Sequence, residues 1–192
     1  MSSDLSKLTD AADKWGEMAG KFKTIENRYE RDVHGVSLGE SWVGQSADAA
    51  NCRFTVTLKE LQGAQKEAKA IASILRDSHI QLVALRGRVN TVRTDAIKDG
   101  MRISDQGVVS FDTEQLSQSA RSAYVHDPGY QESVRAQVTR WTGLLDQAVQ
   151  AVTDADADAG IRLALAAVVV DSDIMDGTMN GFNRSPAKSP YP

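Results

Sequence analysis

Two long stretches of helical apolar spacing, separated by a short turn rich in glycine and serine, constrain the fold of this chain most strongly. In both stretches apolar residues recur every three or four positions, which is the pattern of one apolar helix face. Helices joined by so short a connection fold back antiparallel, because their apolar faces then bury each other. The sequence therefore predicts a helical hairpin over residues 1–98 that turns at Gly39–Ala47. The apolar positions are Leu5, Leu8, Ala12, Trp15, Ala19, Phe22, Ile25, Tyr29 and Val33, then Phe54, Leu58, Leu61, Ala68, Ile71, Leu75, Leu82, Leu85, Val89, Val92 and Ala96.

The turn contains the triplet Trp42-Val43-Gly44, with small residues after it. A glycine there permits the turn to approach the incoming helix, which we expect to start at Ser46, and the indole can cover the open end of the hairpin. A second triplet, Trp141-Thr142-Gly143, lies inside a helical apolar pattern instead. We therefore interpret Trp141 as a core aromatic residue and Trp42 as a turn residue.

The predicted hairpin, with Trp42-Val43-Gly44 at its turn and alanines after it, resembles the WXG superfamily. These are the helical-hairpin proteins handled by type VII (Esx) secretion in actinobacteria and their relatives. The resemblance covers residues 4–98 in pattern. It implies that export machinery or a chaperone recognises the hairpin, its turn and the tail after it, which implicates Trp42 and Gly44 as binding residues. The implied partners are the secretion machinery, a chaperone or another WXG-type protein.

One signal common among substrates of this system is absent in its strict form. Such substrates carry a tyrosine followed four positions later by an acidic residue, whereas the residues at that distance here are apolar. Three explanations stay open: a partner chain supplies the signal, a looser version serves, or this chain is not itself recognised for export. The pairs are Tyr29 with Val33, Tyr124 with Pro128, and Tyr130 with Val134.

The chain changes character after Lys98, where Gly100 is a natural helix terminator. Met101–Ile103 and Val108–Phe111 flank a polar turn and predict a small β-hairpin, which is too small to be stable alone and should cap a helical bundle. We expect a short helix to begin at Thr113–Leu116 and a third long helix to begin near Tyr130. The predicted segments are the hairpin at 1–98, the β-hairpin cap at 99–112, C-terminal helices at 113–175 and a flexible tail at 176–192.

A third long helix is needed because the first two differ in length. At ~1.5 Å per residue the first spans about 45 Å and the second about 80 Å. The first helix covers only part of the second, so the rest of its apolar face needs the helix that follows. The predicted fold class is all-α: an elongated helical bundle built on a long antiparallel helical hairpin, with a small β-hairpin cap. Self-association through a face left exposed stays open.

Composition and charge favour a soluble helical protein, with 41% hydrophobic residues, four prolines and a net charge of −4. Segment 45–98 has nine Lys and Arg against five Asp and Glu, but alternating charge along a helix is typical of a solvated face, so we expect no nucleic-acid partner. The longest apolar window, Ile161–Val170, is far below the ~20 residues of a membrane-spanning helix. With no basic and apolar leader at the N-terminus, we expect a cytoplasmic protein before export, and a secreted or envelope location reached without a cleaved signal peptide.

Residues suited to catalysis or metal binding do not form a recognisable pattern. His34, His79 and His126 lie in separate segments, and Cys52 is a lone cysteine that we interpret as a small helix filler. Asp154-Ala155-Asp156-Ala157-Asp158 resembles the start of a calcium loop, but Ala159 stands where the turn glycine belongs and Leu165 where the bidentate glutamate belongs. We therefore expect a solvated helix face there, with no cofactor, no metal and no enzyme activity.

The sequence thus predicts a noncatalytic helical module that acts by protein–protein interaction, as a type VII secretion substrate or an effector-targeting domain. The alternative is a structural or adaptor coiled-coil protein unrelated to secretion, since any amphipathic three-helix rod shows the same apolar spacing. Partial exposure of Trp42 favours the first hypothesis, and full burial favours the second.

Overall fold

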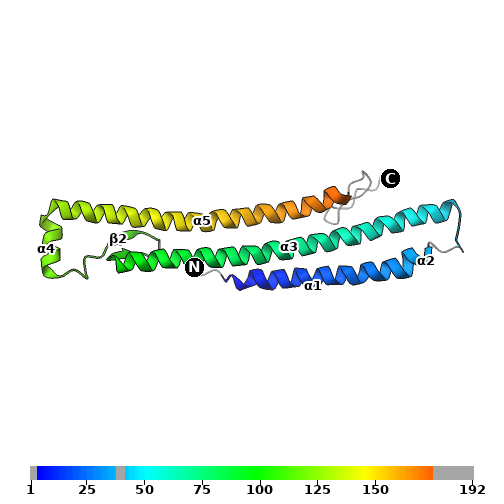
Figure 1. Cartoon of the computed structure of the whole chain (residues 1–192), viewed down its shortest axis with the longest axis horizontal. Coiled ribbons are helices and arrows are strands. Elements are labelled where there is room, and N and C mark those ends of the chain that lie inside the picture. The colour runs from blue at the N-terminus through cyan, green and yellow to red at the C-terminus, as the bar shows by residue number, and fades with distance from the viewer. Residues whose placement is uncertain (1–3, 38–41, 175–192) are drawn as a thin grey trace, which may run out of the picture. The chain divides into compact units, whose positions relative to one another are not determined.

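The computed structural model describes residues 4–37 and 42–174, with side chains described up to residue 166. Figure 1 shows the elements in chain order. They are α1 (Ser6–Tyr29), the π-helical turn η1 (Glu30–His34), α2 (Gly35–Ser37), α3 (Gln45–Lys98), β1 (Met101–Ile103), β2 (Val109–Phe111), α4 (Gln118–His126) and α5 (Pro128–Ile174). The fold is an all-α bundle with a small β-hairpin, as predicted.

The chain divides into two compact units. Unit 1 comprises Met1–His79 and Asp158–Pro192, and unit 2 comprises Ile80–Ala157. Both α3 and α5 contribute residues to each unit. The segment boundaries predicted at residues 99 and 113 stay predictions, and the predicted tail 176–192 lies outside the described residues.

In unit 1, α1 packs antiparallel to the first part of α3. Residues later in α1 contact residues earlier in α3, which is the order of contacts in an antiparallel pair. The helical hairpin is therefore confirmed, with α3 unbroken from Gln45 to Lys98. The contacts are Asp13 Oδ1 with Arg76 Nη2 at 3.0 Å, Glu26 Oε1 with Gln62 Nε2 at 3.0 Å, and the rings of Tyr29 and Phe54 at 6.4 Å.

The inward face of α1 follows a strict seven-residue repeat, in which the three buried side chains are Ala12, Ala19 and Glu26. Ile25, which the sequence placed on this face, is 49% exposed. The reason is geometric: steps of three and four residues permit either position 25 or 26, and the packing of α1 against α3 selects the second. The prediction for Ile25 was wrong, and a carboxylate occupies the inward position.

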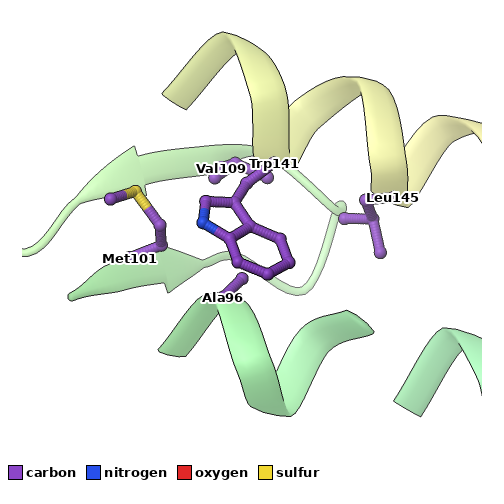
Figure 2. Close-up of a cluster of buried hydrophobic side chains, with 5 residues drawn as sticks. All are labelled: Ala96, Met101, Val109, Trp141 and Leu145. Atoms are coloured by element: carbon purple, nitrogen blue, oxygen red, sulfur yellow. The ribbon is translucent and has the colours of Figure 1, made fainter. Parts of the chain in front are cut away.

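In unit 2, the end of α3, the β-hairpin and α5 enclose an apolar core. Figure 2 shows its buried members with the Trp141 indole at the centre. The partly buried Val89 and Val92 of α3 and Val138 of α5 pack against it. This confirms that the second half of α3 finds its partner in the third long helix. The buried members are Ala96, Met101, Val109, Trp141 and Leu145.

The β-hairpin forms as predicted, with Met101 opposite Phe111 and Ile103 opposite Val109 in antiparallel register. Gly100 adopts a φ of +80°, which ends α3 and redirects the chain into β1. The hairpin turn closes through a 2.9 Å bond from Gly107 N to Ser104 O, with Gly107 also in the left-handed region. Buried Met101 and Val109 fix the hairpin to the core of unit 2.

The short helix α4 starts later than the sequence indicated, at Gln118 rather than Thr113. Asp112 accepts bonds from Glu114 N at 3.0 Å and from Gln115 Nε2 at 2.9 Å, and these hold a turn before the helix. Ser117 then caps α4 by accepting a bond from Ala120 N. The rings of Phe111, Tyr124 and Tyr130 lie with centroids 5.6–6.5 Å apart, so aromatic contacts hold α4 between β2 and α5.

Candidate functional site

The predicted binding residues Trp42 and Gly44 lie between α2 and α3, where the hairpin turns. Trp42 is 43% exposed, neighbouring Val43 is 80% exposed, and Val36 before the turn is 69% exposed. Residues 38–41, which include the predicted turn residues Gly39–Ser41, lie outside the described part of the chain. We name Val36, Trp42 and Val43 the turn surface. Val36 precedes the turn in the sequence and Trp42 and Val43 end it, and all three side chains expose apolar area to solvent.

Gly44 acts through its backbone conformation rather than through close packing. Its φ of +108° lies in the region that favours glycine, and a Cβ built on it would meet no atom of the described residues within 4 Å. The sequence interpretation, that Gly44 permits close approach to the incoming helix, was therefore wrong. The Gly44 carbonyl accepts a 3.1 Å bond from Asp48 N, so this residue directs the chain into the first turn of α3, which begins at Gln45 rather than Ser46.

Polar contacts across the hairpin fix the two sides of the turn. Ser37 is buried and donates its hydroxyl to the His34 carbonyl at 2.7 Å. Asn51 Nδ2 donates to the Ser37 carbonyl at 3.5 Å, and Thr55 Oγ1 lies 3.3 Å from His34 Nε2. Ala47 is buried at the start of α3. These contacts between η1, α2 and α3 were not predicted, because neither Ser37 nor Asn51 belongs to an apolar pattern.

The second tryptophan triplet has the opposite environment. Trp141 is 8% exposed, and its Nε1 donates a 3.2 Å bond to Asp99 Oδ2. The Arg140 guanidinium carbon lies 5.6 Å from the centroid of its ring. Figure 2 shows the indole between the β-hairpin and α3. The interpretation of Trp141 as a core residue is confirmed, so the two tryptophans form a matched pair for experiments.

The residues that could carry chemistry do not converge in the described part of the chain. His34 is in η1, His79 in α3 and His126 at the end of α4, and Cys52 is exposed on α3. Asp154, Asp156 and Asp158 lie exposed within continuous α5, which confirms the helical interpretation of that segment. Among the described residues, no group of three His, Cys, Asp or Glu side chains is arranged to hold a metal ion.

A surface depression and the polarity of the helices bear on which small molecules or membranes the chain could contact. A depression of about 530 Å³ on the exposed side of α1 has a described lining of Glu17, Gly20, Lys21, Thr24 and Ile25, which is one apolar side chain among charged and small ones. None of the described helices combines the length and apolar character that crossing a bilayer requires.

Comparisons of the chain with protein-family models, with curated proteins and with solved structures find no match. The geometry of the turn is therefore the basis for a functional proposal.

Proposed function

We propose that this chain is a noncatalytic helical module that acts by protein–protein interaction, as a type VII secretion (WXG-type) substrate or an effector-targeting domain. The turn surface is its recognition element, and the partner is secretion machinery, a chaperone or another WXG-type protein. The observation that carries the proposal is the 43% exposure of Trp42 beside a glycine with positive φ at the hairpin turn.

The exposure of Trp42 has a physical meaning. Single exposed apolar residues are common, but this turn presents a tryptophan and two valines within eight positions of the chain. Tryptophan is enriched among residues that dominate binding energy, because it offers a large rigid area at a small entropic cost. Unit 2 provides a separate core around Trp141, so the fold does not need Trp42 as its central aromatic residue.

The hydrogen bonds on either side of the turn support the same proposal. Ser37, Asn51 and Thr55 tie the end of α2 to the start of α3, and the conformation of Gly44 fixes the direction of the chain after Trp42. A preorganised anchor binds with less loss of conformational entropy than a mobile one.

The alternative is a structural or adaptor coiled-coil protein unrelated to secretion. The same helical packing serves either function, so the difference lies in whether Trp42 contributes to binding.

The test compares Trp42→Ala with Trp141→Ala in the full chain. We expect Trp42→Ala to keep the melting temperature close to that of the wild type and to reduce export into the culture medium of a host with an active type VII system. Trp141→Ala is the matched control: it lowers the melting temperature, while the fraction that stays folded retains export. Trp42→Phe should restore most of the export, since it keeps an aromatic face.

Two results would contradict the proposal. A folded Trp42→Ala variant exported as efficiently as the wild type would assign the turn a purely structural function. Absence of the wild-type chain from the medium, in a host that exports other type VII substrates, would favour the adaptor alternative.

A further inference from the structure

Helix α3 has two sides in unit 2, and one of them packs against the core. Val89 and Val92 lie on that core side. On the other side Ile80 is 67% exposed, Val83 is 47% exposed and Ile97 is 48% exposed. We name this second side the outer face of α3. Its members recur at steps of three and four residues and are all exposed: Ile80, Val83, Gly87, Asn90, Thr94 and Ile97.

The outer face has the shape of a helix-docking surface. Residues at this spacing form one continuous row along an α-helix. At ~1.5 Å per residue the segment 80–97 is about 27 Å long, which is enough to receive several turns of another helix. Gly87 adds no side chain to the row, and a Cβ there would meet no atom of the described residues within 4 Å. A second helix can therefore approach α3 closely at this point.

In unit 1 the same row of α3 already contacts a helix. Arg76 Nη2 donates to Asp13 Oδ1 of α1, and Gln62 Nε2 donates to Glu26 Oε1, both at 3.0 Å. Helix α3 is unbroken, so the row that receives carboxylates of α1 continues in phase as the outer face. The seven-residue series is Gln62, Lys69, Arg76, Val83, Asn90 and Ile97.

The charges along the outer face have one sign. Among residues 80–94 the charged ones are Arg86, Arg88 and Arg93, and all three are exposed. Arg86 and Arg93 each follow a member of the outer face by three residues, so both border it on one side. The next carboxylate, Asp95, lies 3.3 Å from Lys98. A partner with carboxylates along this border is therefore complementary in charge.

Two other occupants fit this surface less well. Antiparallel pairing of two copies about Asn90 would bring Arg86 beside Arg93 of the other copy, where like charges repel. A nucleic acid would accept the arginines, but its phosphates would not complement the three exposed apolar side chains.

We propose that the outer face of α3 binds an acidic amphipathic helix of a partner protein. That helix places apolar side chains over Val83 and Ile97 and carboxylates beside Arg86 and Arg93. Asn90, between the two apolar contacts, sets its register, as single polar residues do in coiled coils. The surface belongs to unit 2, and it depends neither on the turn surface nor on the function proposed for that surface.

Two synthetic peptides test this proposal with the wild-type full chain. The first is a helix of about 28 residues, with leucine at two positions of every heptad and glutamate on both sides of them. The second has lysine in place of every glutamate. In fluorescence anisotropy titrations the glutamate peptide should bind at least about tenfold more tightly than the lysine peptide. Equal affinities, or no binding of either peptide, would overturn the proposal.

Substitutions locate the binding surface. Val83→Glu should weaken binding of the glutamate peptide at least about tenfold, because it replaces an apolar contact with a repelling charge. Val149→Glu is the matched control on α5, where the side chain is 49% exposed, and should leave binding unchanged. Circular dichroism verifies that each variant is folded, and Ile97→Gln supplies the same test if Val83→Glu does not fold.

The charged border is tested by reversal. The double variant Arg86→Glu/Arg93→Glu should prefer the lysine peptide, because the sign of the border is inverted. An unchanged preference for the glutamate peptide in this variant would overturn the assigned border. Sedimentation of the wild-type chain is the remaining measurement: self-association that Val83→Glu abolishes would assign the outer face to a second copy and overturn the proposal.

Discussion

Unit 1 and unit 2 share two long helices, yet they bury different kinds of side chain. Among the described residues, all four buried polar side chains lie in unit 1, and its buried apolar residues are alanines apart from Leu75. Unit 2 buries larger apolar residues around Trp141. The four polar residues are Glu26, Ser37, Glu67 and Ser78.

The comparison teaches that helix length is a poor guide to local stability. Apolar area removed from water is the dominant favourable term in folding, and alanine removes little of it. Two buried amide atoms in unit 1, Asn51 Oδ1 and Gln65 Nε2, also lack a hydrogen-bond partner among the described residues. Unit 2 should therefore hold the larger share of stability, while unit 1 presents the turn surface.

The largest expected effect is on unit 2. Trp141→Ala should cost about 3–5 kcal/mol in free energy of unfolding, because it leaves a cavity between three elements and leaves Asp99 without the indole donor. Denaturant titration followed by circular dichroism measures this cost. Trp42→Ala is the control and should cost about 1 kcal/mol or less. Equal costs for the two variants would break the proposed difference between the units.

The alanine seam of unit 1 predicts a penalty for added volume. Ala19 is 2% exposed, so Ala19→Leu should destabilise by about 1–3 kcal/mol through overpacking against α3. Gly20→Ala, at the adjacent position with no atom within 4 Å of the added Cβ, should instead stabilise by up to about 1 kcal/mol. The same titration measures both. Stabilisation by Ala19→Leu would mean that the seam contains unfilled space.

A smaller effect is expected at the turn. Gly44→Ala forces a side chain into the left-handed region and should cost about 1–2 kcal/mol without removing any packing contact. Gly87→Ala, in the helical part of α3 with open space around it, should stabilise by roughly 1 kcal/mol. A neutral Gly44→Ala would show that the turn relaxes at no cost.

The smallest effect concerns pH. Burial raises the pKa of Glu26, but bonds from Lys23 and Gln62 together with the charges of Lys23 and Lys69 outweigh it, so the pKa lies below its ordinary value. Charged Glu26 is therefore preferred in the folded state relative to its protonated form. The contribution of Glu26 to the free energy of unfolding is fully present above its unfolded pKa of about 4.3. It is lost as the pH falls through the lower pKa of the folded state.

Hydrogen exchange of α1 between about pH 5 and pH 3, corrected for intrinsic rates, measures that loss. The Glu26→Gln variant is the reference, since the exposed Asp4 and Asp32, whose pKa values are also lowered by bonds from Ser6 and Arg31, titrate in both proteins. Identical pH profiles would show that Glu26 does not titrate within this range.

The sequence was sufficient for the helical hairpin, the long third helix and the β-hairpin, because each rests on a pattern repeated over many residues or on a glycine at a turn. Apolar spacing predicted α3 over nearly its full length, and it placed Trp141 in the core. Errors arose where the local structure depends on a single residue. Spacing of three or four could not separate Ile25 from Glu26, and an assumption that inward positions are apolar selected the wrong one.

The position of the turn was predicted from the sequence, whereas the binding function of Trp42 and Gly44 stays a prediction. Trp42 and Gly44 lie at the turn as expected, yet the role of Gly44 depends on a backbone angle that the sequence does not reveal. Helix α4 starts later than predicted because the side-chain bonds of Asp112 and the cap at Ser117 compete with helix formation in the preceding residues. The sequence does not show which of these hydrogen bonds form.

The π-helical turn η1 has an evolutionary consequence. A bond from Gly35 N to Glu30 O, five residues apart, accommodates one residue more than an α-helix would. The partly buried Trp15, Phe22 and Tyr29 recur every seven residues, and an unbroken α-helix would bring Val36 next in that series. Ser37 is buried instead and Val36 is 69% exposed, so the extra residue shifts the inward position by one. Deleting one codon within Glu30–His34 would let the helix continue in α-helical phase with Ser37 still facing the seam. The inserted residue thus lengthens the helix without changing which residue meets α3 at the turn.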